Sequence, residues 1–247
     1  MLELRAVSKR FGGVVATDEV TLEIVRGEVH ALIGPNGAGK TTLIGQISGV
    51  LATEIGRILF NGADITRLPA HARVAAGLAR SYQITSIFRR FSVLDNLALA
   101  VQARSGTSFR FWRPVTHERA LFDDARAIGA EIGLQARLST VAATLAHGEQ
   151  RALEVGLALA TRPRLVLLDE PMAGMGPPES RAMLALIQRI RRHATVLLVE
   201  HDMDTVFRLA DRITVLVSGR VIASGAPAAI RADPAVRQAY LGEELAA

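Results

Sequence analysis

Apolar and polar residues alternate near the start of the chain, over residues 2–7 and 20–24, so we expect both segments to form half-buried strands. Residues 56–62 predict a further strand bounded by glycines. Unbroken apolar runs occupy residues 164–170, 195–201 and 213–218 instead. Continuous apolar character is typical of parallel strands that are covered on both faces. The pattern therefore predicts both a half-exposed and a fully buried sheet.

Helical periodicity dominates the middle of the chain, over residues 92–103, 118–132 and 149–162. A polar, Arg-rich and aromatic loop, residues 104–114, separates the first two segments. Residues 177–193 predict another helix, which starts with proline, between two of the buried strands. We therefore expect one α/β domain over residues 1–247, with a core formed by residues 1–83 and 162–247. A helical lobe, residues 84–161, interrupts that core.

Composition supports a globular fold, since 49% of the residues are hydrophobic and 21% are charged. No apolar run approaches the roughly 18 residues that span a bilayer. The first residues, MLELRAVSKRF, lack the apolar segment of a signal peptide. We expect a soluble chain that stays where it is made. The absence of cysteine excludes a disulfide framework and a thiolate metal site.

The formal net charge of +5 raises nucleic acid or an anionic membrane surface as partners. The basic residues are scattered, however, and nearly all are arginine, which by itself raises the isoelectric point. Only Lys9 and Lys40 are lysines. This contrast indicates that Lys40 performs a task that needs a compact ammonium group.

The stretch GPNGAGKT matches the phosphate-binding pattern G-x-x-x-x-G-K-[ST] between a predicted strand and a predicted helix. Its glycines let backbone N–H groups approach a polyphosphate, and the following helix directs its N-terminal dipole at that anion. Lys40 then reaches the β- and γ-phosphates, and the Thr41 hydroxyl ligates Mg²⁺. The sequence thus predicts nucleotide binding by Gly34, Pro35, Asn36, Gly37, Ala38, Gly39, Lys40, Thr41 and Thr42.

Two carboxylates, Asp169 and Glu170, follow a buried strand. Open α/β sheets bind ligands beyond the carboxyl ends of their strands, so we expect Asp169 at the metal and Glu170 as the base that accepts a proton from water. The next predicted strand ends at His201, whose imidazole would reach the γ-phosphate. Gln83 lies where the core meets the lobe, and its amide would contact Mg²⁺ or water. On spacing alone, structural roles for His201 and Gln83 stay open.

The stretches GPNGAGKTT, LAHGEQR, LVLLDEP and VEHDM, in this order, resemble the ATP-binding cassette (ABC) subunit of ABC transporters. The resemblance implies a P-loop NTPase core of ABC type, with an antiparallel β subdomain and an inserted α-helical subdomain. It also identifies LAHGEQR as the signature motif. In the family, this motif serves the nucleotide held by the other cassette of a head-to-tail dimer. The signature residues that would act in trans are Ala146, His147, Gly148 and Glu149.

The resemblance further assigns Gln83 to the Q-loop, with a catalytic and metal role, and His201 to the switch histidine. Phe11 stands where the family stacks an aromatic ring on adenine, although by itself it would be a core residue. ATP and Mg²⁺ are the cofactors that the family uses. Ala146 replaces a common serine, and Ala173 and Gly176 replace a common serine and aspartate after Pro171. These departures raise weak communication between sites, or an asymmetric partner, as possibilities.

Further stretches, including MAGMGPPE and AYLGEE, resemble the cassettes of branched-chain amino-acid uptake systems. That resemblance implies two permease subunits, a periplasmic substrate-binding protein and a second cassette, identical or paralogous. It places the chain on the cytoplasmic face of a bacterial inner membrane. The stretches LPAHAR and SIFRRFSVLDNL also resemble the cassette that powers lipopolysaccharide extraction, which is the alternative. A nucleic-acid-linked ABC ATPase is more distant, because the segment between Gln83 and Leu145 is too short for a coiled-coil insertion.

Overall fold

The structure, a computed structural model of the chain, describes residues 1–81, 87–105 and 119–241. Four strands form an antiparallel sheet in the order β2-β1-β4-β5. The strands are β1 (Leu2–Phe11), β2 (Val14–Ile24), β4 (Ile55–Phe60) and β5 (Ala63–Asp64). The buried side chains of β1, β2 and β4 share an apolar core with α1 (Lys40–Ser48). The alternation predicted for residues 2–7 and 20–24 is confirmed as half-buried antiparallel strands.

The second sheet has six strands in the order β10-β9-β3-β8-β7-β6. Its members are β3 (Val29–Ile33), β6 (Leu78–Arg80), β7 (Leu165–Asp169), β8 (Thr195–Val199), β9 (Arg212–Val217) and β10 (Arg220–Gly225). Five strands run parallel, and β10 pairs antiparallel with β9 at the edge. Every residue of β3, β7 and β8 is buried, as their unbroken apolar character predicts.

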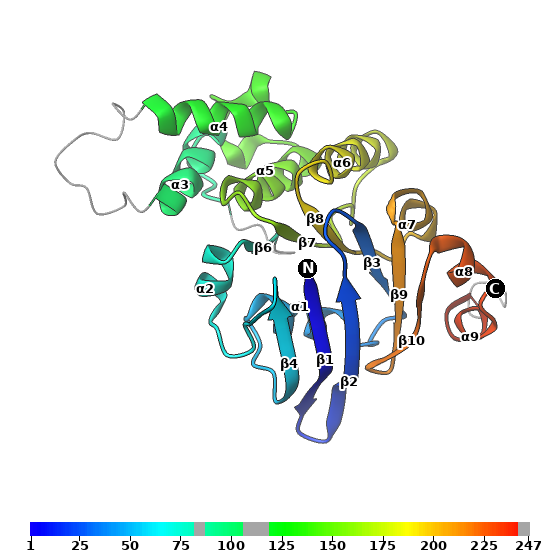
Figure 1. Cartoon of the computed structure of the whole chain (residues 1–247). Coiled ribbons are helices and arrows are strands. Elements are labelled where there is room, and N and C mark those ends of the chain that lie inside the picture. The colour runs from blue at the N-terminus through cyan, green and yellow to red at the C-terminus, as the bar shows by residue number, and fades with distance from the viewer. Residues whose placement is uncertain (82–86, 106–118, 242–247) are drawn as a thin grey trace.

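The lobe side of the molecule carries α3 (Val93–Ser105), α4 (Arg119–Glu131) and α5 (His147–Ala160), which pack together away from the antiparallel sheet (Figure 1). A large apolar core joins these helices to β7, β8 and α6 (Pro177–Ile190). The remaining helices are α2 (Ala70–Ala75), α7 (Met203–Leu209), α8 (Pro227–Ala232) and α9 (Pro234–Val236). The helices predicted at residues 92–103, 118–132, 149–162 and 177–193 all form, whereas β5, β6, β10, α2 and the helices after β8 were not predicted.

The division into a core and a lobe at residues 84 and 161 stays a prediction. Gln83 and most of the loop at residues 104–114 lie outside the described residues. Among the helices of the described ranges, none combines the length and apolar character that crossing a bilayer requires.

Candidate functional site

The phosphate-binding loop joins the end of β3 to α1. Gly39 precedes α1 at φ 100°, and a Cβ there would lie 2.1 Å from the carbonyl oxygen of Ala16, so only glycine fits. The helix receives no side-chain cap at its first turn. No side chain thus caps the N-terminus of α1, a place where an anion is favoured.

Lys40 is the first residue of α1 and is 9% exposed. Its Nζ donates to the carbonyl oxygens of Gly34, at 2.6 Å, and Pro35, at 3.0 Å. Burial lowers the pKa of the Lys40 ammonium below its ordinary value, and the Glu170 and Asp169 carboxylates act in the opposite direction. Lys40 therefore lies within electrostatic reach of both predicted carboxylates.

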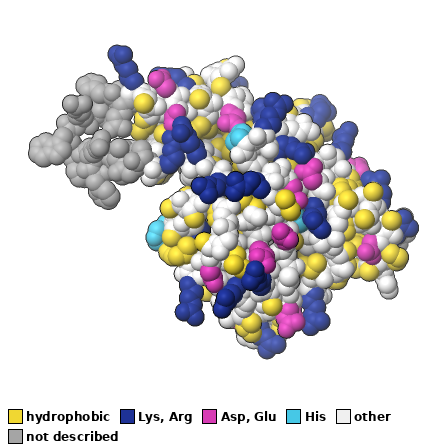
Figure 2. Space-filling view, viewed as in Figure 1, with side chains coloured by type: hydrophobic (Ala, Val, Ile, Leu, Met, Phe, Trp, Pro, Cys, Tyr) yellow, Lys and Arg dark blue, Asp and Glu magenta, His cyan; other side chains and the backbone are white. Residues whose placement is uncertain are grey.

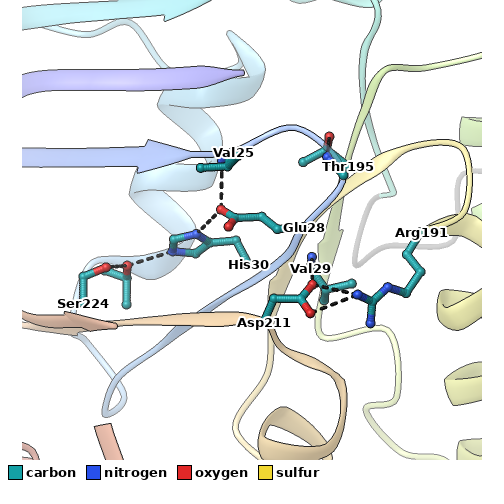
Figure 3. A network of polar contacts seen from close by, with 10 residues as sticks. Val25, Glu28, Val29, His30, Arg191, Thr195, Asp211 and Ser224 are labelled. Carbon is teal, nitrogen blue, oxygen red and sulfur yellow. Dashed lines mark hydrogen bonds and ion pairs between the residues drawn. The ribbon is translucent and has the colours of Figure 1, made fainter. Parts of the chain in front are cut away.

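A polar network holds β3, the strand that carries the loop (Figure 3). His30 is fully buried and contacts the Glu28 carboxylate through Nδ1, at 2.9 Å, and the Thr214 hydroxyl through Nε2, at 2.8 Å. The Thr214 hydroxyl in turn contacts that of Ser224 on β10. Asp211 accepts the N–H of the residue that opens β3, at 2.8 Å. These contacts connect β3, the strand from which the loop starts, to β9 and β10.

Asp169 ends β7 and is 3% exposed. Its Oδ2 accepts a 2.8 Å hydrogen bond from Nη2 of Arg80, the last residue of β6. The Nη1 of Arg80 reaches the Ser48 hydroxyl, at 3.3 Å, at the end of α1. The buried carboxylate is thus balanced by a guanidinium that only the parallel pairing of β6 with β7 brings to it.

Glu170 follows β7 in the left-handed region, at φ 48°. A non-glycine residue rarely adopts this conformation, and such strain is concentrated at functional sites. Its backbone N–H donates to the carbonyl oxygen of Val199, at 2.9 Å, and Asp169 pairs with Val199 across the sheet. The strands β7 and β8 are therefore neighbours in the sheet. Their ends bring Glu170 and His201 to the same edge of the sheet.

Glu200 lies between the end of β8 and His201, and it is 1% exposed. Its carboxylate accepts the backbone N–H of Met172, at 3.1 Å, and that of His201, at 3.3 Å. Burial raises the pKa of Glu200, and the neighbouring Glu170 adds to the rise. The His201 ring is largely exposed, with Nδ1 3.9 Å from the Glu200 carboxylate. One buried carboxylate therefore joins the backbone after Glu170 to the backbone of His201.

The signature residues form the start of α5, as predicted. Ala146 is the N-cap and brings no side-chain acceptor, while Glu149 accepts the N–H of Ala146, at 3.0 Å. His147 contacts the carbonyl oxygen of Ala173, at 3.3 Å. The Gly148 N–H does not point at open solvent: it donates to the carboxylate of Glu179 in α6, at 3.1 Å.

Phe11 is 48% exposed at the end of β1, with Lys9 Nζ 5.2 Å from its ring centroid. The alternative that it is a core residue is wrong. Thr41 and Thr42 lie in the first turn of α1, exposed and half-buried respectively. Gln83 lies outside the described residues, so its place at the site stays a prediction.

Phe88 and Phe91 form an exposed apolar pair in the segment that precedes α3. They are 57% and 45% exposed, and their rings stack with centroids 5.6 Å apart. Buried Asn96 accepts the N–H of Phe88 and donates to its carbonyl oxygen, which fixes the backbone while the ring projects outward. The two rings therefore do not pack into the core. A cavity of about 240 Å³ adjoins this pair, and its lining includes Phe91, Leu99 and Phe122.

Charge on the molecular face shown in Figure 2 is mixed: Lys and Arg side chains lie among acidic ones and do not gather into one band. Three arginine and glutamate residues of the site, Arg80, Glu179 and Glu200, were not predicted individually. Glu179 and Glu200 stand within the stretches MAGMGPPE and VEHDM, and Arg80 stands in neither; the partner of each of the three is between 28 and 89 positions away. Spacing alone therefore carries no signal for these contacts.

The described residues contain no group of three or more His, Cys, Asp or Glu side chains that could hold a metal ion by themselves. Mg²⁺ is ordinarily held by one or two protein oxygens together with substrate phosphates and water. The donor set here, one exposed hydroxyl on Thr41 and one buried carboxylate on Asp169, fits that second mode.

The chain is similar in sequence to known ABC transporter proteins. A family model described as ABC transporter matches residues 17–173. A second, described as branched-chain amino acid ATP-binding cassette transporter, matches residues 220–246. The chain is 38% identical over 250 residues to the high-affinity branched-chain amino acid transport ATP-binding protein BraF of Pseudomonas aeruginosa, with 98% of each chain covered. It is 37% identical to LivG of Escherichia coli, which has the same description and coverage.

The lipopolysaccharide export system ATP-binding protein LptB of Escherichia coli is 33% identical over 244 residues, again with 98% of each chain covered. Two solved structures are also similar over nearly the whole chain. A nucleotide-free ATP-binding cassette from an ABC transporter superposes with a TM-score of 0.85 at 27% identity, over 97% of this chain and 98% of that one. An ATP-binding cassette in its ADP conformation gives a TM-score of 0.86 at 28% identity, with 98% of each chain covered.

Proposed function

Because the chain belongs to the ABC transporter family, whose ATP-binding subunits hydrolyse ATP to power transport, we propose that it drives an importer of branched-chain amino acids or related amides. The observation that carries the cargo class is the match of residues 220–246 to the branched-chain cassette family, beside similarity to BraF over the whole chain. LptB is less similar, at 33% identity, so lipopolysaccharide extraction is the second candidate.

The proposed nucleotide site begins at the loop that joins β3 to α1. Lys40 now donates to two carbonyl oxygens of its own loop, and a triphosphate would offer stronger, charged acceptors in their place. The N–H groups at the start of α1 would receive the same phosphates. Phe11, whose ring is exposed, would stack on adenine, and Asn36 and Gly37, also exposed, would line the approach.

Thr41, Asp169 and Gln83 would hold Mg²⁺, which when bound neutralises charge on the phosphate oxygens. Arg80 holds the Asp169 carboxylate in place at the end of β7. Glu170 directly follows β7 with its backbone in the left-handed region, and it would accept the proton of the attacking water. His201, on the adjacent strand end, would contact the γ-phosphate.

The signature at the start of α5 would complete a site whose phosphate loop belongs to a second cassette. Helix N-termini favour anions, and α5 would direct its first N–H groups at that γ-phosphate. Ala146 supplies no hydroxyl there, so Gly148 would carry more of the contact. The partner is a second copy of this chain or a paralogue.

The exposed Phe88 and Phe91, with the apolar cavity beside them, would receive a permease subunit. Two such subunits and, indirectly, a periplasmic binding protein complete the proposed importer, with this chain at the cytoplasmic face of the inner membrane.

Glu170→Gln tests the proposed chemistry. Glutamine keeps the shape of the side chain but cannot take a proton, so we expect ATP affinity within about threefold of wild type and turnover reduced at least ~100-fold, the usual scale of a general base. Nucleotide binding by fluorescence titration and phosphate release are measured on the same preparation. Turnover within a few-fold of wild type would identify another group as the base.

A further inference from the structure

The carboxylate of Glu179 lies at the N-terminus of the signature helix α5. The N–H of Gly148, in the first turn, donates to Oε1 of Glu179, at 3.1 Å. The other oxygen of the same carboxylate accepts the N–H of Gly176, at 3.2 Å, which caps α6. Glu179 therefore spans two helix N-termini with one charged group.

The approach is so close that a side chain at position 148 would have to displace Glu179. A Cβ on Gly148 would lie 2.8 Å from Oε1 and 2.9 Å from Cδ of Glu179. The carboxylate thus rests against the α carbon of Gly148, at the place where an anion bound by this N–H would also lie. Because Ala146 has no hydroxyl, no side chain of the N-cap competes for that place.

We propose that Glu179 occupies, within one chain, the position that the partner-held γ-phosphate takes when two cassettes close on ATP. The inference rests on the proposed function, because it assumes that the signature acts in trans. One N–H cannot donate fully to two anions, and two anions at one helix N-terminus repel each other. Glu179 must therefore leave Gly148 before the dimer closes, and it sets the ATP and protein concentrations at which closure occurs.

A purely structural role for Glu179 makes the opposite prediction. If the carboxylate only caps α6, its loss weakens the fold around the signature and weakens dimerisation with it. If it competes with phosphate, its loss tightens dimerisation. The sign of the change separates the two roles.

Glu179→Gln is the sharper substitution. Glutamine at the third helical position still completes the capping box of α6, so the cap on Gly176 survives. It removes the negative charge that faces Gly148. A carboxylate at a helix N-terminus is worth up to about fivefold in an equilibrium constant, and a symmetric dimer releases two of them. We expect the ATP-dependent dimer to form more tightly, by up to about 25-fold.

The experiment compares Glu170→Gln, which slows hydrolysis, with Glu170→Gln/Glu179→Gln, by sedimentation over a range of protein concentrations at saturating Mg-ATP. A matched control, Glu170→Gln/Asp123→Asn, removes one negative charge on α4, where the Asp123 side chain is 71% exposed. Hydrogen exchange of the Gly148 amide without nucleotide reports the contact itself. We expect that amide to exchange faster in the Glu179→Gln chain.

Tighter dimerisation of the Glu179→Gln chain, with the control unchanged, supports the inference. If Glu170→Gln dimerises with ATP but Glu179→Gln leaves the dimer unchanged or weaker, the inference is overturned while the proposed function stands. If neither chain dimerises although both bind ATP, the trans role of the signature fails and the inference fails with it. Equal exchange of the Gly148 amide in both chains also overturns it.

Discussion

The buried ion pair between Arg80 and Asp169 ties the carboxylate that we propose binds Mg²⁺ to strand β6. Its atoms lie 2.8 Å apart, and the two side chains are 10% and 2% exposed. Arg80→Met keeps much of the apolar stem and removes the charge. The Asp169 carboxylate then stays buried without its guanidinium.

Removal of one partner of a buried pair costs about 3–5 kcal/mol, because the remaining charge keeps its desolvation penalty. We expect Arg80→Met to lower the free energy of unfolding of the nucleotide-free chain by about 3 kcal/mol, toward the lower end, since Arg80 keeps slight exposure. For a chain of this size that is a fall in melting temperature of about 6–12 °C.

Urea denaturation of four chains measures the effect: wild type, Arg80→Met, Asp169→Asn and the double variant. If the pair is the cause, the double variant loses less stability than the sum of the single variants, by about 2 kcal/mol. The control is Arg191→Met, whose partner Asp211 is also a carboxylate. The two side chains of that pair are 37% and 41% exposed. An exposed pair of this kind contributes less than about 1 kcal/mol.

Additive losses, to within about 0.5 kcal/mol, would refute the ion-pair reasoning, because they would show that Arg80 and Asp169 act on stability independently. A loss for Arg191→Met as large as that for Arg80→Met would also refute it. In that case burial would not be what makes the Arg80 pair strong.

Three further outcomes follow from the same structure. Burial raises the pKa of Glu200 above its ordinary 4.5, so the free energy of unfolding falls as pH rises through the folded-state pKa. Glu200→Gln stays neutral, so we expect its free energy of unfolding, measured by urea denaturation across a pH series, to change less with pH in this range. Phe88→Ala with Arg90→Ala lowers transport several-fold in a reconstituted complex and leaves ATP binding to the isolated chain intact, and unchanged transport would rule out this docking surface. We expect the Lys40→Ala chain and the Gly148→Asp chain each to be inactive alone. Their mixture recovers ATP-dependent association, because one composite site combines an intact phosphate loop with an intact signature. Normal ATP hydrolysis by a folded Gly148→Asp chain would refute the hypothesis that the signature acts in trans.

The sequence by itself determined the elements whose pattern is local. The alternation of residues 2–7, the unbroken apolar runs of β7 and β8, and the glycines before Lys40 each express a constraint that acts within a few residues. The nucleotide site follows from such constraints, because loop, helix and strand end are contiguous in the chain. The short β6 and the antiparallel edge strand β10 have weak patterns, and their pairing partners in the sheet decide them.

Only the tertiary structure decided which charged groups meet. Arg80 finds Asp169 across 89 positions, and Glu179 finds Gly148 across 31. Neither residue type nor spacing encodes these pairs, because an ion pair depends on the distance between side chains after the sheet and helices have packed. The exposure of Phe88 has the same origin: a phenylalanine is expected inside, and the buried Asn96 that fixes its backbone turns the ring outward. Local patterns thus specify the framework of the site, and packing specifies which anion, cation or apolar surface each part of it presents.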